Sequence, residues 1–134
     1  MIFKDYEGIK IIRLENFYKR FDDLPVFIET DVEVNFKNAF AKERLEFELS
    51  HFEDLKIFLE KVEKELSKYF TFQNLEEQFK ISFEVIDTRF LKISGFLKNT
   101  MYTSVLNFSF QMPKTEISYL IIHLDEVISR YGDG

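Results

Sequence analysis

The order of its apolar patterns constrains the fold of this chain more than any single residue does. Alternation of apolar and polar residues, which is typical of strands, occurs at residues 7–14, 26–36, 39–49, 79–85, 91–97 and 106–112. The 3.6-residue spacing of an amphipathic helix occurs at residues 51–69 and 115–131. Three strands and a helix are therefore expected to be followed by three more strands and a second helix.

This order predicts an α+β fold in βββα-βββα order. Because each strand has one apolar face and each helix one apolar stripe, we expect a six-stranded, mainly antiparallel sheet with both helices packed on one face. The opposite face of the sheet should stay open. A chain of 134 residues suits a single domain, residues 1–134, with one core that 17 Phe and no Trp must fill.

The best-defined segment is the predicted hairpin at residues 26–49. Even positions from Val26 to Phe36 form its apolar face, and Lys37-Asn38 can close a two-residue turn because Asn tolerates positive φ. That turn sets the outward residues opposite one another in the pairs Glu33 and Lys42, Asp31 and Arg44, Glu29 and Glu46, and Phe27 and Glu48. The first two pairs join opposite charges, whereas the last two leave uncompensated negative charge at the far end.

The outward carboxylates of this hairpin are the candidate partner-binding residues: Glu29, Asp31, Glu33, Glu46 and Glu48. One interpretation is a solvated sheet face that Lys42 and Arg44 partly neutralise. The other is an electrostatic docking face for a basic protein, since complementary charge raises the association rate. The loops at residues 22–25 and 73–77 are the next candidates.

Several local signals mark element ends and one close contact. Ser50 and Glu53 have the spacing of a capping box, Thr115 is the expected N-cap of the second helix, and Gly132 is its expected stop. If the last three strands share one register, Gly95 lies between Ile81 and Phe108. The missing side chain there leaves room for a large aromatic neighbour.

The residue inventory argues against common catalytic and metal chemistry. The chain has no Cys, and its two histidines, His51 and His123, lack a second His or Cys at ligand spacing. Its few glycines form neither a phosphate-binding loop nor a nucleophile elbow. We therefore expect no enzyme activity, no metal and no cofactor.

Charge and hydropathy indicate where the protein acts. Charged residues interrupt the first six residues too early for a signal peptide, and no apolar run approaches membrane-spanning length. The formal net charge of -6 repels phosphate backbones. We expect a cytoplasmic protein with no nucleic-acid or membrane partner, for which a basic protein is the electrostatically easier partner.

Five short segments of apolar and polar residues also occur in an order that resembles a known family. They are His51-Phe52-Glu53-Asp54-Leu55, Glu77-Gln78-Phe79-Lys80-Ile81, Leu91-Lys92-Ile93-Ser94-Gly95, Leu106-Asn107-Phe108-Ser109-Phe110 and Ile117-Ser118-Tyr119-Leu120. Over residues 26–131 this order resembles the WapI-type immunity proteins of bacteria. The resemblance implies a small cytoplasmic protein that binds and neutralises a cognate toxin, often a nuclease, by occlusion.

Two other functions remain open from the residues alone. A structural or adaptor domain could homodimerise through the same open sheet face. A small-ligand-binding domain could use a pocket between helices and sheet. A stoichiometric basic partner, a concentration-dependent mass or a ligand-induced melting shift would distinguish the three.

Overall fold

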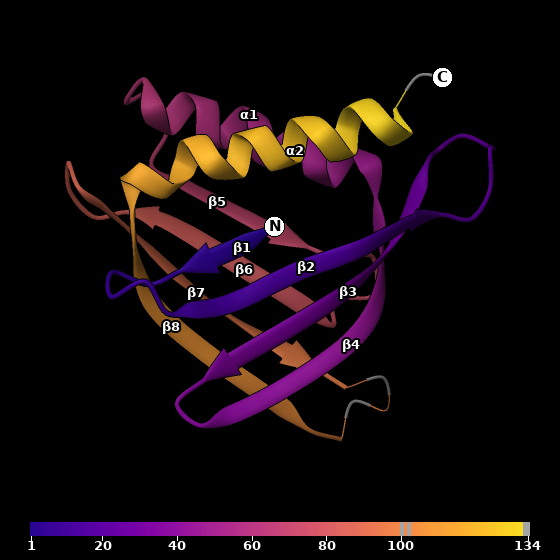
Figure 1. Cartoon of the computed structure of the whole chain (residues 1–134), viewed down its shortest axis with the longest axis horizontal. Helices are drawn as coiled ribbons and strands as arrows, with labels where there is room; N and C mark the ends of the chain where they lie inside the picture. Colours follow the sequence, from indigo (N-terminus) through magenta and orange to yellow (C-terminus); the bar gives the residue numbers. More distant parts are fainter. Residues whose placement is uncertain (100, 102, 133–134) are drawn as a thin grey trace.

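The chain folds as two successive units, each of four strands and one helix (Figure 1). The computed structural model describes residues 1–99, 101 and 103–132. The first unit contains β1 (Ile2–Lys4), β2 (Lys10–Lys19), β3 (Phe27–Phe36), β4 (Ala39–Glu48) and α1 (Leu49–Glu63). The second contains β5 (Tyr69–Gln73), β6 (Phe79–Val85), β7 (Phe90–Lys98), β8 (Val105–Pro113), the 3₁₀ turn η1 (Lys114–Glu116) and α2 (Ile117–Tyr131).

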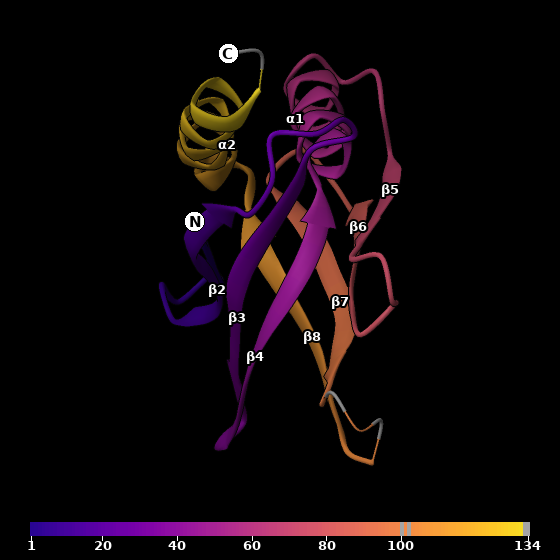
Figure 2. The same cartoon turned by 90° about the vertical axis from the view of Figure 1, so that its right-hand side faces the viewer.

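The strands form two four-stranded antiparallel sheets that face each other. Their orders are β1-β2-β3-β4 and β5-β6-β7-β8. Figure 2 shows the two sheets as separate layers, with α1 and α2 side by side across one end. Phe47 of the first sheet stacks on Phe72 of the second, with ring centroids 5.3 Å apart, and meets Phe79 edge-on. The apolar face of each sheet is thus covered by the other.

The predicted single six-stranded sheet is therefore wrong, although the α+β class is confirmed. Two short strands, β1 and β5, were missed, because three and five residues give too little alternation to detect. The parity of each strand shows that one face is buried, but it does not show what buries that face. Here a second sheet does so, and the helices cover the end of the sandwich rather than one face of a common sheet (Figures 1 and 2).

The helices close the core at that end. The ring of Phe52 in α1 packs against Phe47 and Phe72, one from each sheet, and Phe58 packs against Phe70 and Phe83. The Ser118 hydroxyl of α2 donates a 3.0 Å hydrogen bond to Glu63 of α1 and holds the helices together. One hydrophobic cluster includes residues of both sheets and both helices.

The helix boundaries correct several expectations. α1 begins at Leu49 with Glu48 at the N-cap position and no side-chain capping bond, so Ser50 does not cap it. It ends at Glu63 rather than near residue 69, because Tyr69 already belongs to β5. Thr115 lies inside η1 and does not cap α2. Gly132 is correct as the stop of α2.

The hairpin prediction is confirmed in register and in turn. Lys37 and Asn38 both have positive φ, at 48° and 63°, and all four predicted outward pairs are observed between β3 and β4. Gly95 lies between Ile81 and Phe108, as expected. A Cβ built on Gly95 would lie 1.8 Å from the Lys80 carbonyl oxygen and 3.1 Å from the Phe108 ring. Only glycine fits at this position.

Candidate partner-binding surface

The acidic face, formed by Glu29, Asp31, Glu33, Glu46 and Glu48, lies on the outside of the first sheet. These residues alternate along β3 and β4 with core residues such as Val32 and Phe47, so they point away from the second sheet. The helices lie across the end of the sandwich and leave this face uncovered (Figure 2). The sheet thus presents the predicted carboxylates on one surface.

Asp31 and Glu33 are compensated by basic residues of the opposite strand. Arg44 Nη1 lies 2.9 Å from Asp31 Oδ1, and Lys42 Nζ lies 3.5 Å from Glu33 Oε1. The Asn16 side-chain amide also donates a 2.7 Å hydrogen bond to Asp31 Oδ2. The hydrogen bonds from Asn16 and Arg44 lower the pKa of Asp31 below its ordinary value. This half of the acidic face is an ordered charge network.

Glu29 departs from the prediction, because its charge is compensated too. Arg20 Nη2 lies 2.6 Å from Glu29 Oε1, and Arg44 Nη2 lies 3.9 Å from Oε2. The expected strand at residues 7–14 in fact runs from Lys10 to Lys19, with an irregularity at Asn16, whose φ is 57°. It pairs Tyr18 with Glu29 and so brings Arg20 to the same side of the sheet.

Glu46 and Glu48 carry the uncompensated charge that the register predicts. No ion pair or hydrogen bond joins either carboxylate to another residue within the described ranges. Glu46 is exposed and Glu48 is half-buried, at the end of β4. The acidic face therefore runs from a neutralised middle to a bare anionic end.

The two loops predicted as the next candidate partner-binding regions, at residues 22–25 and 73–77, flank this anionic end. A cavity of about 300 Å³ lies between Glu29, Arg44 and Glu46 on one side and residues of the β5–β6 loop on the other, among them Asn74, Leu75, Glu76 and Gln78. The Leu75 amide donates to the Glu46 carbonyl at 3.4 Å, which fixes that loop against β4. The β2–β3 loop lies on the other side and carries exposed Phe21 and Leu24.

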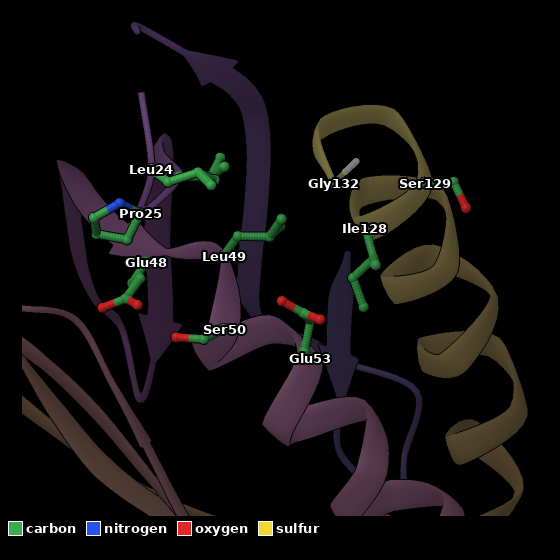
Figure 3. Close-up of a pocket in the computed structure, with 10 residues that line it drawn as sticks. Leu24, Pro25, Glu48, Leu49, Ser50, Glu53, Ile128, Ser129 and Gly132 are labelled. Atoms are coloured by element: carbon green, nitrogen blue, oxygen red, sulfur yellow. The ribbon is translucent and has the colours of Figure 1, made fainter. Parts of the chain in front are cut away.

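A groove opens where the anionic end meets the two helices (Figure 3). This end groove has a volume of about 450 Å³. It is lined by Leu24, Pro25, Val26, Glu48, Leu49, Ser50, Glu53, Ile128, Ser129 and Gly132. Glu48 belongs both to the acidic face and to the groove, so the two are continuous.

Three hydrogen bonds, two within the backbone and one from a side chain, hold the walls of the end groove. The Leu49 amide donates to the Val26 carbonyl at 2.9 Å and joins the start of α1 to the β2–β3 loop. The Gly132 amide donates to the Ile128 carbonyl at 2.7 Å and ends α2. The Tyr131 hydroxyl donates to the Phe17 carbonyl at 2.7 Å and ties α2 to β2. The segments that line the groove are therefore held in place by hydrogen bonds of the fold.

The histidines do not assemble into a site. Within residues 1–99, 101 and 103–132, no group of three or more His, Cys, Asp or Glu side chains is placed to hold a metal ion. The Nδ1 atom of His51 is buried and has no hydrogen-bond partner among the described residues. None of the helices described is long and apolar enough to cross a membrane.

Sequence reasoning located the acidic face but missed Arg20 and the end groove. Phe17-Tyr18-Lys19-Arg20 does not alternate between apolar and polar residues, so no periodic signal indicated that the second strand extends to a pairing with Glu29. The end groove also had no local sequence signal, because Leu24, Glu53 and Ile128 come from three distant parts of the chain.

An open, charged sheet face flanked by loops and a groove is the kind of surface through which one protein binds another. Residues 3–132 match the family model described as the immunity protein WapI-like family. The match spans nearly the whole chain, and the chain therefore belongs to this family of immunity proteins. The resemblance found at residues 26–131 is confirmed. No curated protein matches the chain.

Proposed function

We propose that this protein binds and neutralises a cognate bacterial toxin, and that it does so by covering the toxin rather than by catalysis. Membership of an immunity-protein family supports a toxin partner. The open face of the first sheet supplies a surface for that partner (Figure 1). The complex is proposed to form in the cytoplasm, where an arriving toxin would act.

The observation that carries the binding mode is the uneven compensation of the acidic face. Asp31, Glu33 and Glu29 form ion pairs with basic residues, whereas Glu46 and Glu48 form none in the described structure. A network that is already neutral adds little attraction for a partner. The bare carboxylates are therefore proposed as the centre of a docking site for a basic surface.

A nuclease toxin fits this chemistry. A protein that acts on nucleic acid needs a basic surface to hold phosphates, and an acidic protein complements that surface. The net charge of -6 adds long-range attraction, which speeds association at low salt. Occlusion of the basic surface would exclude the nucleic acid from the toxin.

Growth protection tests the proposed function. Cells that produce the toxin domain encoded beside this gene should stop growing, and co-expression of the wild-type protein should restore growth. The purified pair should form a stoichiometric complex. Failure to protect against that toxin would contradict the proposal. A mass that doubles with concentration in the absence of toxin would then favour homodimerisation through the open face.

A further inference from the structure

We propose that the end groove receives the side chain of one arginine from the toxin, with its guanidinium held at Glu53. This inference rests on the proposed function and names the contact that would anchor the complex. The groove and the acidic face share Glu48, so a partner seated on the face reaches the groove without a second binding event.

The walls of the groove suit the aliphatic part of a long side chain. Leu24, Leu49 and Ile128 approach from a loop and from both helices (Figure 3). Leu24 is 86% exposed, so apolar surface lies open here in the free protein. Burial of such surface by a partner is favourable in proportion to the area covered.

The carboxylate of Glu53 defines the charge of the occupant. Figure 3 shows its side chain reaching from α1 toward Ile128 of α2, on the opposite side of Leu49 from Glu48 and Ser50. Neither an ion pair nor a hydrogen bond connects Glu53 to another residue in the part of the chain that the structure describes. An unpaired carboxylate beside an apolar wall fits a cation on an apolar stem.

Arginine fits this combination better than lysine. Its guanidinium is planar and weakly hydrated, so it can pack against Leu49 and Ile128 while donating to Glu53. An ammonium group keeps its water and gains less from apolar walls. Arginine is also enriched among the residues that carry most of the energy of protein interfaces.

A titration with a side-chain analogue tests the groove without the toxin. The ¹H–¹⁵N spectrum of the full chain is recorded with n-butylguanidinium, and with n-butylammonium and 1-butanol as comparisons. Butylguanidinium should shift the amide signals of Ser50, Glu53, Ile128 and Ser129 in a saturable way, with a dissociation constant of about 1 mM. Butanol should give weaker shifts there that do not saturate.

Two substitutions sharpen the titration. Glu53→Gln should weaken butylguanidinium binding about fivefold, whereas Glu84→Gln, an exposed change on the second sheet, should leave it unchanged. Leu24→Ser should also weaken binding, and Leu66→Ser, at another exposed leucine, should not. All four positions are exposed, so the fold should persist, and each variant is checked by its melting temperature.

The groove assignment is overturned by an absence of saturable shifts, by an equal response to butanol, by tighter binding of butylammonium, or by unchanged binding in Glu53→Gln. In co-expression, Glu53→Gln should protect cells less well than Glu84→Gln does. Equal protection by both variants would also overturn it while leaving toxin neutralisation intact. A wild-type protein that binds butylguanidinium but never protects would instead contradict the proposed function.

Discussion

Arg20 and Glu29 form an ion pair of 2.6 Å that joins the base of the β2–β3 loop to the acidic face. The pair neutralises a carboxylate that strand register alone leaves uncompensated. Glu29 lies directly opposite Glu46 in the register, so the pair places a neutralised carboxylate beside a bare one. The position of this single arginine therefore determines which part of the face can attract a basic partner.

Removal of the Arg20 charge should strengthen that attraction. Arg20→Gln leaves Glu29 with only the more distant Arg44, so the acidic face becomes more negative. We expect faster association with the basic toxin at low salt, by about two- to threefold, and no gain at high salt. Stopped-flow mixing measures this rate. A slower rate would show that Arg20 itself contacts the partner.

The Phe-rich core should dominate stability. Phe83 and Phe108 are 0% and 3% exposed, whereas Phe27 is half-buried on the outside of the first sheet. Phe83→Ala and Phe108→Ala should each lower the free energy of unfolding by about 3 to 5 kcal/mol. Phe27→Ala should cost much less. Urea denaturation measures all three, and equal losses would contradict the assignment of inner and outer faces.

Gly95 should not tolerate even one added methyl group. A Cβ at this position would overlap the Lys80 carbonyl oxygen, which belongs to the backbone and cannot rotate away. Gly95→Ala should therefore destabilise the protein by about 3 kcal/mol or more. Ser94→Ala, at the neighbouring half-buried position, serves as the matched control and should be nearly neutral. Comparable melting temperatures for both variants would refute the contact.

The charge network at Asp31 should appear in the pH dependence of stability. The folded pKa of Asp31 lies below its ordinary value of 3.8 because Asn16 and Arg44 donate hydrogen bonds to the charged form. A lowered folded pKa contributes stability above the unfolded pKa, and this contribution is lost as pH falls through the folded pKa.

Replacement of the carboxyl group isolates that contribution. Asp31→Asn should be less stable than wild type at about pH 6, and the difference should shrink toward about pH 2, as the wild-type carboxyl takes up a proton. Thermal unfolding at both pH values measures the difference. A difference that stays constant or grows toward low pH would show that the charge of Asp31 is not stabilising.

Local pairing in this fold could be predicted because it depends on neighbouring residues. The turn at Lys37-Asn38 and the alternation on either side of it determine every pair from Phe27 and Glu48 to Phe36 and Ala39. Gly95 followed from the same kind of reasoning. The uncompensated charge of Glu46 and Glu48 was predicted for this reason as well.

The layering could not be predicted, because it depends on contacts between distant residues. The stack of Phe47 on Phe72 joins the two sheets, yet both rings would also be buried in a single sheet under two helices. β5 was hidden for a related reason, since Leu66 and Tyr69 continue the apolar spacing of the preceding helix while the chain has already left it. The end groove likewise needs residues from three separate segments.

The association rate of the purified protein with its cognate toxin, measured across low and high salt, tests the central claim most directly. Glu46→Gln with Glu48→Gln removes the two carboxylates of the acidic face that form no ion pair in the described structure, and Glu84→Gln with Glu116→Gln removes equal charge elsewhere. We predict that the first variant associates about tenfold more slowly at low salt, with a weaker salt dependence, and that the second stays close to wild type. Equal rates for both variants at every salt concentration would contradict docking through the acidic face.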